Sequence, residues 1–207
     1  LGVAKRAFTD LRAVGVRRSV PIATLIALLT LISSLTRGKC STKHFPSFTC
    51  LNTRRPMGEE FEKIKLMYGE SFRLHGDSPA SLLTPKGRNE LRFRAIDPFV
   101  KGSGITSVLD YGCGLGYLFE YLRNERIKFS YCGMDVMPEF VESCIKKYSS
   151  GATFENIDPN ASISGHYDVV FSSGVFNLQT HADREESKSY AFERLEQLFV
   201  ATRQVLV

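Results

Sequence analysis

The chain has 207 residues, 43% hydrophobic and 24% charged, which is the composition of an ordinary globular protein with one full core and room for an additional segment. The net charge of +5 comes from residues 1–56, which hold ten Lys or Arg and one acid, so residues 57–207 are net acidic. This distribution argues against a nucleic-acid partner, because binding to a phosphate backbone depends on Lys and Arg.

Residues 1–56 form a basic leader or anchor segment. Five basic residues precede the uncharged stretch 19–36, which is just long enough to cross a membrane. Three interpretations stay open: a membrane anchor, an organelle-targeting transit peptide within residues 1–36, and a leader that is not native protein, since the first methionine is Met57. The last interpretation predicts that a chain starting at Met57 keeps all function. Membrane contact is expected only through residues 19–36.

The five cysteines have no Cys-x-x-Cys spacing and cannot all be bridged; they are Cys40, Cys50, Cys113, Cys132 and Cys144. The last three fall in a glycine loop, a buried strand and the apolar face of a helix. We expect them to be reduced core thiols, which is typical of a cytoplasmic protein. Three of the histidines have no metal-ligand spacing to Cys, Asp or Glu, so no metal site is expected.

Residues 57–104 predict two helices. The first has acids in its first turn and an apolar stripe made of Phe61, Ile64, Leu66 and Tyr68. A polar stretch, 70–83, follows and contains a turn at 76–79. Thr84-Pro85 predicts the start of the second helix, with threonine as N-cap and proline in the first turn. Its expected buried face consists of Leu91, Ala95, Ile96 and Phe99.

The stretch 108–118, Val-Leu-Asp-Tyr-Gly-Cys-Gly-Leu-Gly-Tyr-Leu, predicts a strand, a tight loop and the start of a helix. Glycine leaves no side chain between the main chain and a ligand, and the helix that follows offers unpaired N–H groups, so the loop suits a bound nucleoside. A second short buried strand, 129–136, ends in Asp135. A carboxylate at the end of a strand beside such a loop can accept two hydrogen bonds from a ribose diol.

The rest of the chain alternates helices with short strands. Further strands are expected at 152–156 and from Tyr167 onward. A long helix is expected to begin at a capping box, Thr180-x-x-Asp183, to bury Phe192 and to end near Gln204, with a fifth strand starting at 205. Such alternation predicts an α/β fold with a parallel sheet.

The pattern Asp-x-Gly-x-Gly-x-Gly from Asp110, with Asp135 at the end of the next strand, resembles the class I S-adenosylmethionine-dependent methyltransferases. The resemblance covers residues 100–180, about the first half of that catalytic domain. It implies an α/β, Rossmann-like three-layer sandwich with a mostly parallel sheet whose C-terminal strands are missing here. The chain is then divided into the leader 1–56, an N-terminal helical lid 57–104, and a partial methyltransferase domain 105–207.

The resemblance implies S-adenosyl-L-methionine as cofactor and assigns its contacts by position. The methionine part would lie on the loop residues Gly112, Cys113, Gly114 and Gly116. Asp110 would reach the amino group and Asp135 would hold the ribose hydroxyls. Val136 and Ile157 would sandwich the adenine, and Asp158 would accept from its exocyclic amine.

The resemblance also implies where the methyl group is transferred. Ser173, Phe176 and Asn177, after the fourth strand, would line that site, and Phe176 or Tyr111 would face the sulfonium as a cation-π partner. His181 is the nearest candidate for a general base. In this fold an N-terminal segment often covers the cofactor. Candidates for lid or substrate contacts are therefore Tyr68, Phe72, Arg73 and His75.

Enzymes of this fold that methylate the exocyclic amines of bases carry an Asp/Asn-Pro-Pro-Tyr/Phe motif after the fourth strand. The sequence here is Ser172-Ser173-Gly174-Val175-Phe176-Asn177, which lacks that motif. This difference argues against a base as acceptor and favours a small molecule that reacts through oxygen, carboxylate, carbon or aliphatic nitrogen.

Two other interpretations remain. A nucleotide-cofactor oxidoreductase would carry Gly-x-Gly-x-x-Gly, but the third position is Tyr117. A non-catalytic protein, either an S-adenosylmethionine-binding module or a truncated product, would keep the pocket without turnover.

Overall fold

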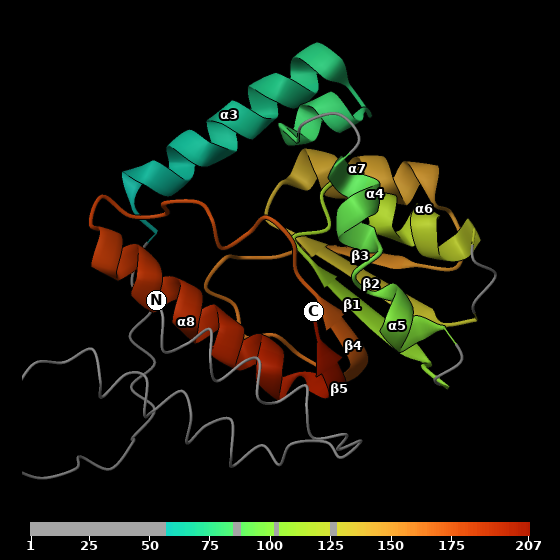
Figure 1. Ribbon diagram of the computed structural model, residues 1–207. Helices are drawn as coiled ribbons and strands as arrows, with labels where there is room; N and C mark the ends of the chain where they lie inside the picture. The colour runs from blue at the N-terminus through green and yellow to red at the C-terminus, as the bar shows by residue number, and fades with distance from the viewer. Residues whose placement is uncertain (1–56, 85–87, 102–103, 125–127) are drawn as a thin grey trace, which may run out of the picture. The chain divides into compact units, whose positions relative to one another are not determined.

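The computed structural model describes residues 57–84, 88–101, 104–124 and 128–207. In these residues five strands form one sheet in the order β3-β2-β1-β4-β5, and each neighbouring pair is parallel (Figure 1). The strands are β1 (Ser107–Tyr111), β2 (Ser130–Asp135), β3 (Thr153–Asn156), β4 (Tyr167–Phe171) and β5 (Thr202–Leu206). The α/β, Rossmann-like class is confirmed. Ligands of such sheets bind outside the carboxyl ends of the strands where the order reverses, here between β1 and β4.

The described helices lie on both faces of this sheet and above its carboxyl end. They are α3 (Glu59–His75), the 3-10 turn η1 (Pro79–Leu82), α4 (Arg88–Phe93), α5 (Asp97–Val100), α6 (Tyr117–Asn124), α7 (Pro138–Lys147) and α8 (Arg184–Val200). Figure 1 shows α4 to α7 on one side of the sheet and α8 on the other. Three layers result.

Side-chain alternation along the central strands builds the two cores. Val108 of β1 packs with residues of α6 and α7, whereas the next residue, Leu109, packs with Leu198 of α8. All three side chains have no exposed surface. Because successive strand residues point to opposite faces, a continuous apolar run is needed where both faces are covered.

Helix α3 and the turn η1 are held to the rest of the domain by both apolar and polar contacts. The rings of Tyr68 and Phe72 meet the edge of Phe140 at centroid distances of 6.1 and 5.5 Å. In the turn after α3, Asp77 accepts a hydrogen bond from the Tyr117 hydroxyl at 3.1 Å and lies 3.3 Å from Lys147 Nζ. These contacts hold α3 and η1 against the start of α6 and the end of α7.

Two details of the predicted N-terminal segment are wrong. Helix α3 continues to His75, through the first part of the stretch expected to be polar, and Leu66 of the predicted stripe is 72% exposed. The second predicted helix is two short ones, with Ile96 buried but Leu91 69% exposed. Pro98 at the start of α5 cannot donate a main-chain hydrogen bond, so the helix breaks before it. The predicted start at Pro85 lies outside the described residues.

The C-terminal helix also differs from the prediction. Its N-cap is Asp183, whose Oδ1 accepts from the main-chain N–H of Glu185 and Glu186 at 2.7 and 2.9 Å, and not Thr180. The helix ends at Val200, and β5 begins at Thr202. Phe192 is 59% exposed because Leu198 occupies the inner face.

None of the helices within the described residues is long and apolar enough to cross a membrane. The stretch 19–36, the candidate for a membrane span, lies outside them.

Candidate functional site

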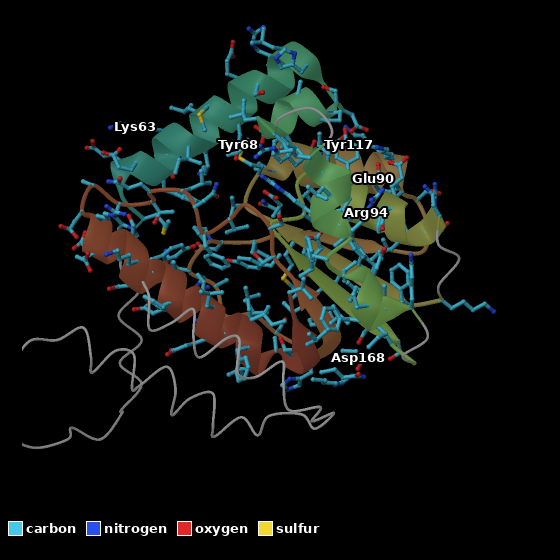
Figure 2. The ribbon with its side chains drawn as sticks, in the orientation of Figure 1. Lys63, Tyr68, Glu90, Arg94, Tyr117 and Asp168 are labelled. Atoms are coloured by element: carbon cyan, nitrogen blue, oxygen red, sulfur yellow. The ribbon has the colours of Figure 1, made fainter. Side chains whose placement is uncertain are left out.

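A cavity of about 230 Å³ lies at the carboxyl ends of β1, β2 and β4. The residues that follow these strands line it together with side chains of α3 and α4. Tyr68 of α3 and Tyr117 of α6 belong to its wall (Figure 2). The cavity therefore lies between the N-terminal helices and the switch point of the sheet.

The glycine loop contributes bare main chain to the cavity wall. The N–H groups of Gly112 and Cys113 both donate to the carbonyl of Met134, at 2.7 and 3.1 Å, which ties the loop to the end of β2. Gly112 and Gly114 have φ of 79° and 54°, and a Cβ would lie 2.2 Å from Val175 Cγ2 at Gly112 and 2.8 Å from Leu82 Cδ2 at Gly114. Only glycine fits both the backbone angle and the space.

Gly116 does not line the cavity. A Cβ at this position would meet Tyr148, Cys144 and Phe154 at 2.8 to 3.2 Å. The third glycine of the motif thus allows α6 to pack closely against α7 and β3.

Asp135 is 8% exposed and lines the cavity at the end of β2. Its Oδ2 accepts from the main-chain N–H of Gly114 at 2.8 Å, and its Oδ1 accepts from that of Met137 at 2.9 Å. Burial raises the pKa of the Asp135 carboxyl, and these N–H groups oppose the shift. Each oxygen retains acceptor capacity for a ligand hydroxyl.

Asp110, at the end of β1, is 4% exposed and accepts a hydrogen bond from the Tyr131 hydroxyl. Burial raises the pKa of Asp110 to about 7, the Tyr131 bond opposes that shift, and the neighbouring Asp135 charge adds to it. Two buried carboxyl groups on adjacent strands therefore line one cavity.

Two of the three residues predicted to contact the adenine line the cavity, and one does not. Val136 and Ile157 line the cavity. Asp158 does not; it is exposed, and its Oδ1 accepts from the main-chain N–H of Asn160 at 2.7 Å, as in an ordinary turn.

The predicted methyl-transfer residues are divided too. Ser173 and Asn177 line the cavity, whereas Phe176 does not. The Phe176 ring stacks on Tyr111 instead, with a centroid distance of 6.4 Å and an interplanar angle of 11°. Tyr111 itself is part of the wall.

Of three further predicted site residues, one lines the cavity and two do not. Tyr68 lines the cavity, but Arg73 points to solvent and pairs with Glu70 at 2.7 Å. His181 is 9% exposed and outside the wall; its Nδ1 lies 2.9 Å from the hydroxyl oxygen of Thr180, which does line the cavity.

Several wall residues of the N-terminal segment were not predicted from the sequence. Asn89 and Arg92 of α4 and Lys65 of α3 line the cavity. The spacing of residues 89 and 92 places both on one helix face, a signal that was hidden because the apolar positions of this short helix are not periodic. Within the described residues, no group of three or more His, Cys, Asp or Glu side chains is placed to hold a metal ion.

Comparison with known proteins places this geometry in a family. Residues 108–197 match the family described as a methyltransferase domain. The curated protein "Putative methyltransferase Rv1506c" of Mycobacterium tuberculosis is 32% identical over 109 residues, which are 53% of this chain and 61% of that protein. The chain thus spans less than two thirds of that relative.

Solved structures agree in fold. Magnesium protoporphyrin IX methyltransferase from Synechocystis PCC 6803 with bound SAH has a TM-score of 0.52 at 20% identity, covering 71% of this chain and 70% of that one. Phosphoethanolamine N-methyltransferase 1 of Haemonchus contortus, in complex with phosphoethanolamine and S-adenosylhomocysteine (SAH), gives 0.51 at 16% identity, covering 70% and 30%. An oxidoreductase is not favoured by these comparisons. The glycine loop after β1, the parallel sheet and the match of residues 108–197 together support a methyltransferase domain of the class I S-adenosylmethionine-dependent type over these residues.

Proposed function

We propose that the chain is an S-adenosylmethionine-dependent methyltransferase that acts on a small molecule through oxygen, carboxylate, carbon or aliphatic nitrogen. One observation carries the proposal: the glycine loop and Asp135 line the same cavity at the switch point of the sheet. A nucleoside with a charged tail needs both a close main-chain surface and a carboxylate for its ribose.

The cavity residues fit this cofactor. Gly112, Cys113 and Gly114 would lie against the methionine part, and Asp110 would accept from its ammonium. Asp135 would accept from the ribose hydroxyls with the lone pairs that Gly114 and Met137 leave free. Val136 and Ile157 supply apolar surface for the adenine.

When bound, the cofactor would supply a methyl group on a sulfonium: the acceptor forms a bond to the methyl carbon as the opposite C–S bond breaks, and the neutral thioether is the leaving group. The protein's contribution is alignment in a closed site, so no dedicated base is required when the acceptor is already nucleophilic. Ser173 and Asn177 would orient the acceptor from the loop after β4. His181 would accept a proton only through the Thr180 hydroxyl, since its own ring is outside the cavity wall.

Isothermal titration of the full chain with S-adenosylmethionine, SAH and NAD tests the proposal. We expect the first two ligands to bind and NAD to fail. Asp135→Ala should weaken SAH binding at least about tenfold, because a hydrogen bond to a charged group is worth about 1.5–3 kcal/mol. Asp135→Asn keeps the side-chain size, and its affinity for SAH should lie between those of the wild type and of Asp135→Ala.

Glu142→Ala is the control, since this side chain is 69% exposed on α7. A folded Asp135→Ala protein, verified by its thermal melt, with unchanged SAH affinity would contradict the assignment. Turnover with methyl-labelled cofactor separates an enzyme from a binding module.

We also propose a reducing, cytoplasmic location. It is supported by three free buried thiols, Cys113, Cys132 and Cys144.

A further inference from the structure

The charged residues of the cavity wall are not evenly mixed. Two are carboxyl groups at the ends of the strands, Asp110 and Asp135, and two are cations of the N-terminal segment, Lys65 and Arg92. The carboxyl groups suit the ammonium and the ribose hydroxyls of the cofactor. The cations belong to α3 and α4, which are parts of the wall not needed for the nucleoside.

The two cations differ in what neutralises them. Lys65 Nζ lies 3.1 Å from Glu62 Oε1. Arg92 is half-buried, and none of the described residues forms an ion pair or a hydrogen bond with its guanidinium. Its acidic neighbour on α4, Glu90, pairs instead with Arg94 at 3.1 Å on the solvent side (Figure 2). A partly buried guanidinium without a partner loses hydration that only an anion can replace fully.

Arg92 is also directed toward the methyl-transfer end of the cavity. Its Nη1 lies 3.5 Å from the position that a Cβ on Gly174 would occupy, and Gly174 follows Ser173 after β4. The Tyr68 hydroxyl is influenced electrostatically by Asp135 at one end of the cavity and by Arg92 at the other. Burial raises the pKa of the Tyr68 hydroxyl, the Asp135 charge raises it further, and Arg92 opposes both.

We propose that the methyl acceptor carries an anionic group, a carboxylate or a phosphate, and that Arg92 binds this group in the cavity. Asn89, three residues earlier on α4, also lines the cavity and adds a neutral donor on the same side. The inference rests on the proposed function and names the chemical class of its acceptor. A planar guanidinium recognises such groups through two parallel N–H donors, whereas a cationic acceptor would be repelled.

The test measures binding of matched probes to the SAH-saturated full chain by titration calorimetry. The pairs are benzoate and benzamide, 4-hydroxybenzoate and 4-hydroxybenzamide, and phenyl phosphate and phenol. We expect the anion of at least one pair to bind more than tenfold tighter than its neutral partner. Arg92→Gln should abolish that preference, and Arg92→Lys should restore part of it. Arg94→Gln, which removes a nearby arginine that points to solvent, should leave the preference intact.

A second arm separates the acceptor from the cofactor's own carboxylate. SAH carries that carboxylate and 5′-methylthioadenosine does not. We expect Arg92→Gln to change the affinity for neither ligand. A loss of SAH affinity with methylthioadenosine affinity kept would assign Arg92 to the cofactor and overturn the proposal.

The proposal is equally overturned if no pair shows a preference for the anion, or if the preference survives in Arg92→Gln. Failure of the wild-type chain to bind SAH at all is a different result, because it rejects the proposed function before any probe is added.

Discussion

Under the proposed function, cofactor binding depends on the charge state of the two buried carboxyl groups of the cavity. Asp110 and Asp135 end neighbouring strands, and both have a pKa raised first of all by burial. An ionised Asp110 is the stronger acceptor for an ammonium, and burial keeps part of this group neutral at neutral pH. A cationic ligand beside Asp110 would lower its pKa and so favour the ionised form.

Cofactor binding should depend on pH through Asp110. We expect the affinity for SAH to rise as pH increases through about 7, the pKa of this group. Titration between pH 6 and pH 8.5 measures it. Asp110→Asn should bind weakly with a flat profile over this range, because its amide does not titrate. Tyr131→Phe should shift the profile to higher pH, because the Tyr131 bond holds the pKa down. A wild-type profile without slope contradicts the role.

The raised pKa of Asp110 affects stability in the opposite direction: affinity for SAH should rise with pH, whereas the contribution of Asp110 to stability falls. The folded state holds a proton on Asp110 that the unfolded chain has already released above pH 4. The contribution of Asp110 to the free energy of unfolding is therefore greatest below pH 4 and falls as pH rises toward about 7.

At the scale of elements, one side chain joins the start of β1 to β4. Asp168 accepts from the N–H and the hydroxyl of Thr106 at 2.8 and 2.7 Å and from the N–H of Ser107 at 3.1 Å. The hydrogen bonds from Thr106 hold the pKa of this carboxyl below its usual range. Asp168 lies at the opposite end of β4 from the cavity residues (Figure 2), so its task is to fix strand pairing.

Asp168→Ala should lower the free energy of unfolding by about 2–3 kcal/mol, since three donors lose a charged acceptor. Urea denaturation at pH 7 measures the change. In the wild type this stabilisation is present above the unfolded-state pKa of about 4 and is lost as pH falls through the lower folded-state pKa.

Asp158→Ala, at an exposed carboxylate, is the control and should have a much smaller effect. Equal losses in the two variants would show that the bonds of Asp168 contribute nothing specific. SAH affinity of folded Asp168→Ala should be unchanged.

At the scale of the whole domain, the glycine loop and the core are one packed unit. Cys113 of the loop and Cys144 of α7 are buried, and Cys144 Sγ donates to the carbonyl of Gly114 at 3.4 Å. The hydrogen bond with Cys144, and then burial, raise the pKa of the Cys113 thiol, which leaves little reactive thiolate.

Alkylation of these thiols should therefore report on opening of the domain. We expect Cys113 and Cys144 to react with iodoacetamide only as fast as the domain opens, measured for each peptide by mass spectrometry. SAH at about 100 times its dissociation constant should slow both by about 100-fold, because it binds only the folded state. Fast labelling of Cys144, insensitive to SAH, would show that α7 opens independently of the loop.

Local patterns predicted the strands and the glycine loop because short apolar runs bounded by glycine leave few alternatives. They failed for residues 88–101, where Pro98 divides one expected helix into two, and where Leu91, expected to be buried, is exposed. The family resemblance placed Gly116 and Asp158 in the site, and neither lines the cavity. Spacing along the chain cannot tell which side of a turn faces the ligand; Gly116 faces the Tyr148 side, and Asp158 caps its own turn.

The sequence by itself determined the parallel sheet, the cradle at Gly112 and Gly114, and the carboxylate at Asp135, because each depends on a local backbone requirement or on one strand end. Only the tertiary structure brought Arg92 of α4 beside Gly174, 82 positions later in the chain, and left it without an acidic partner among the described residues. Charge pairing depends on distances between elements that are far apart in sequence, and those distances are set by how the lid packs on the domain.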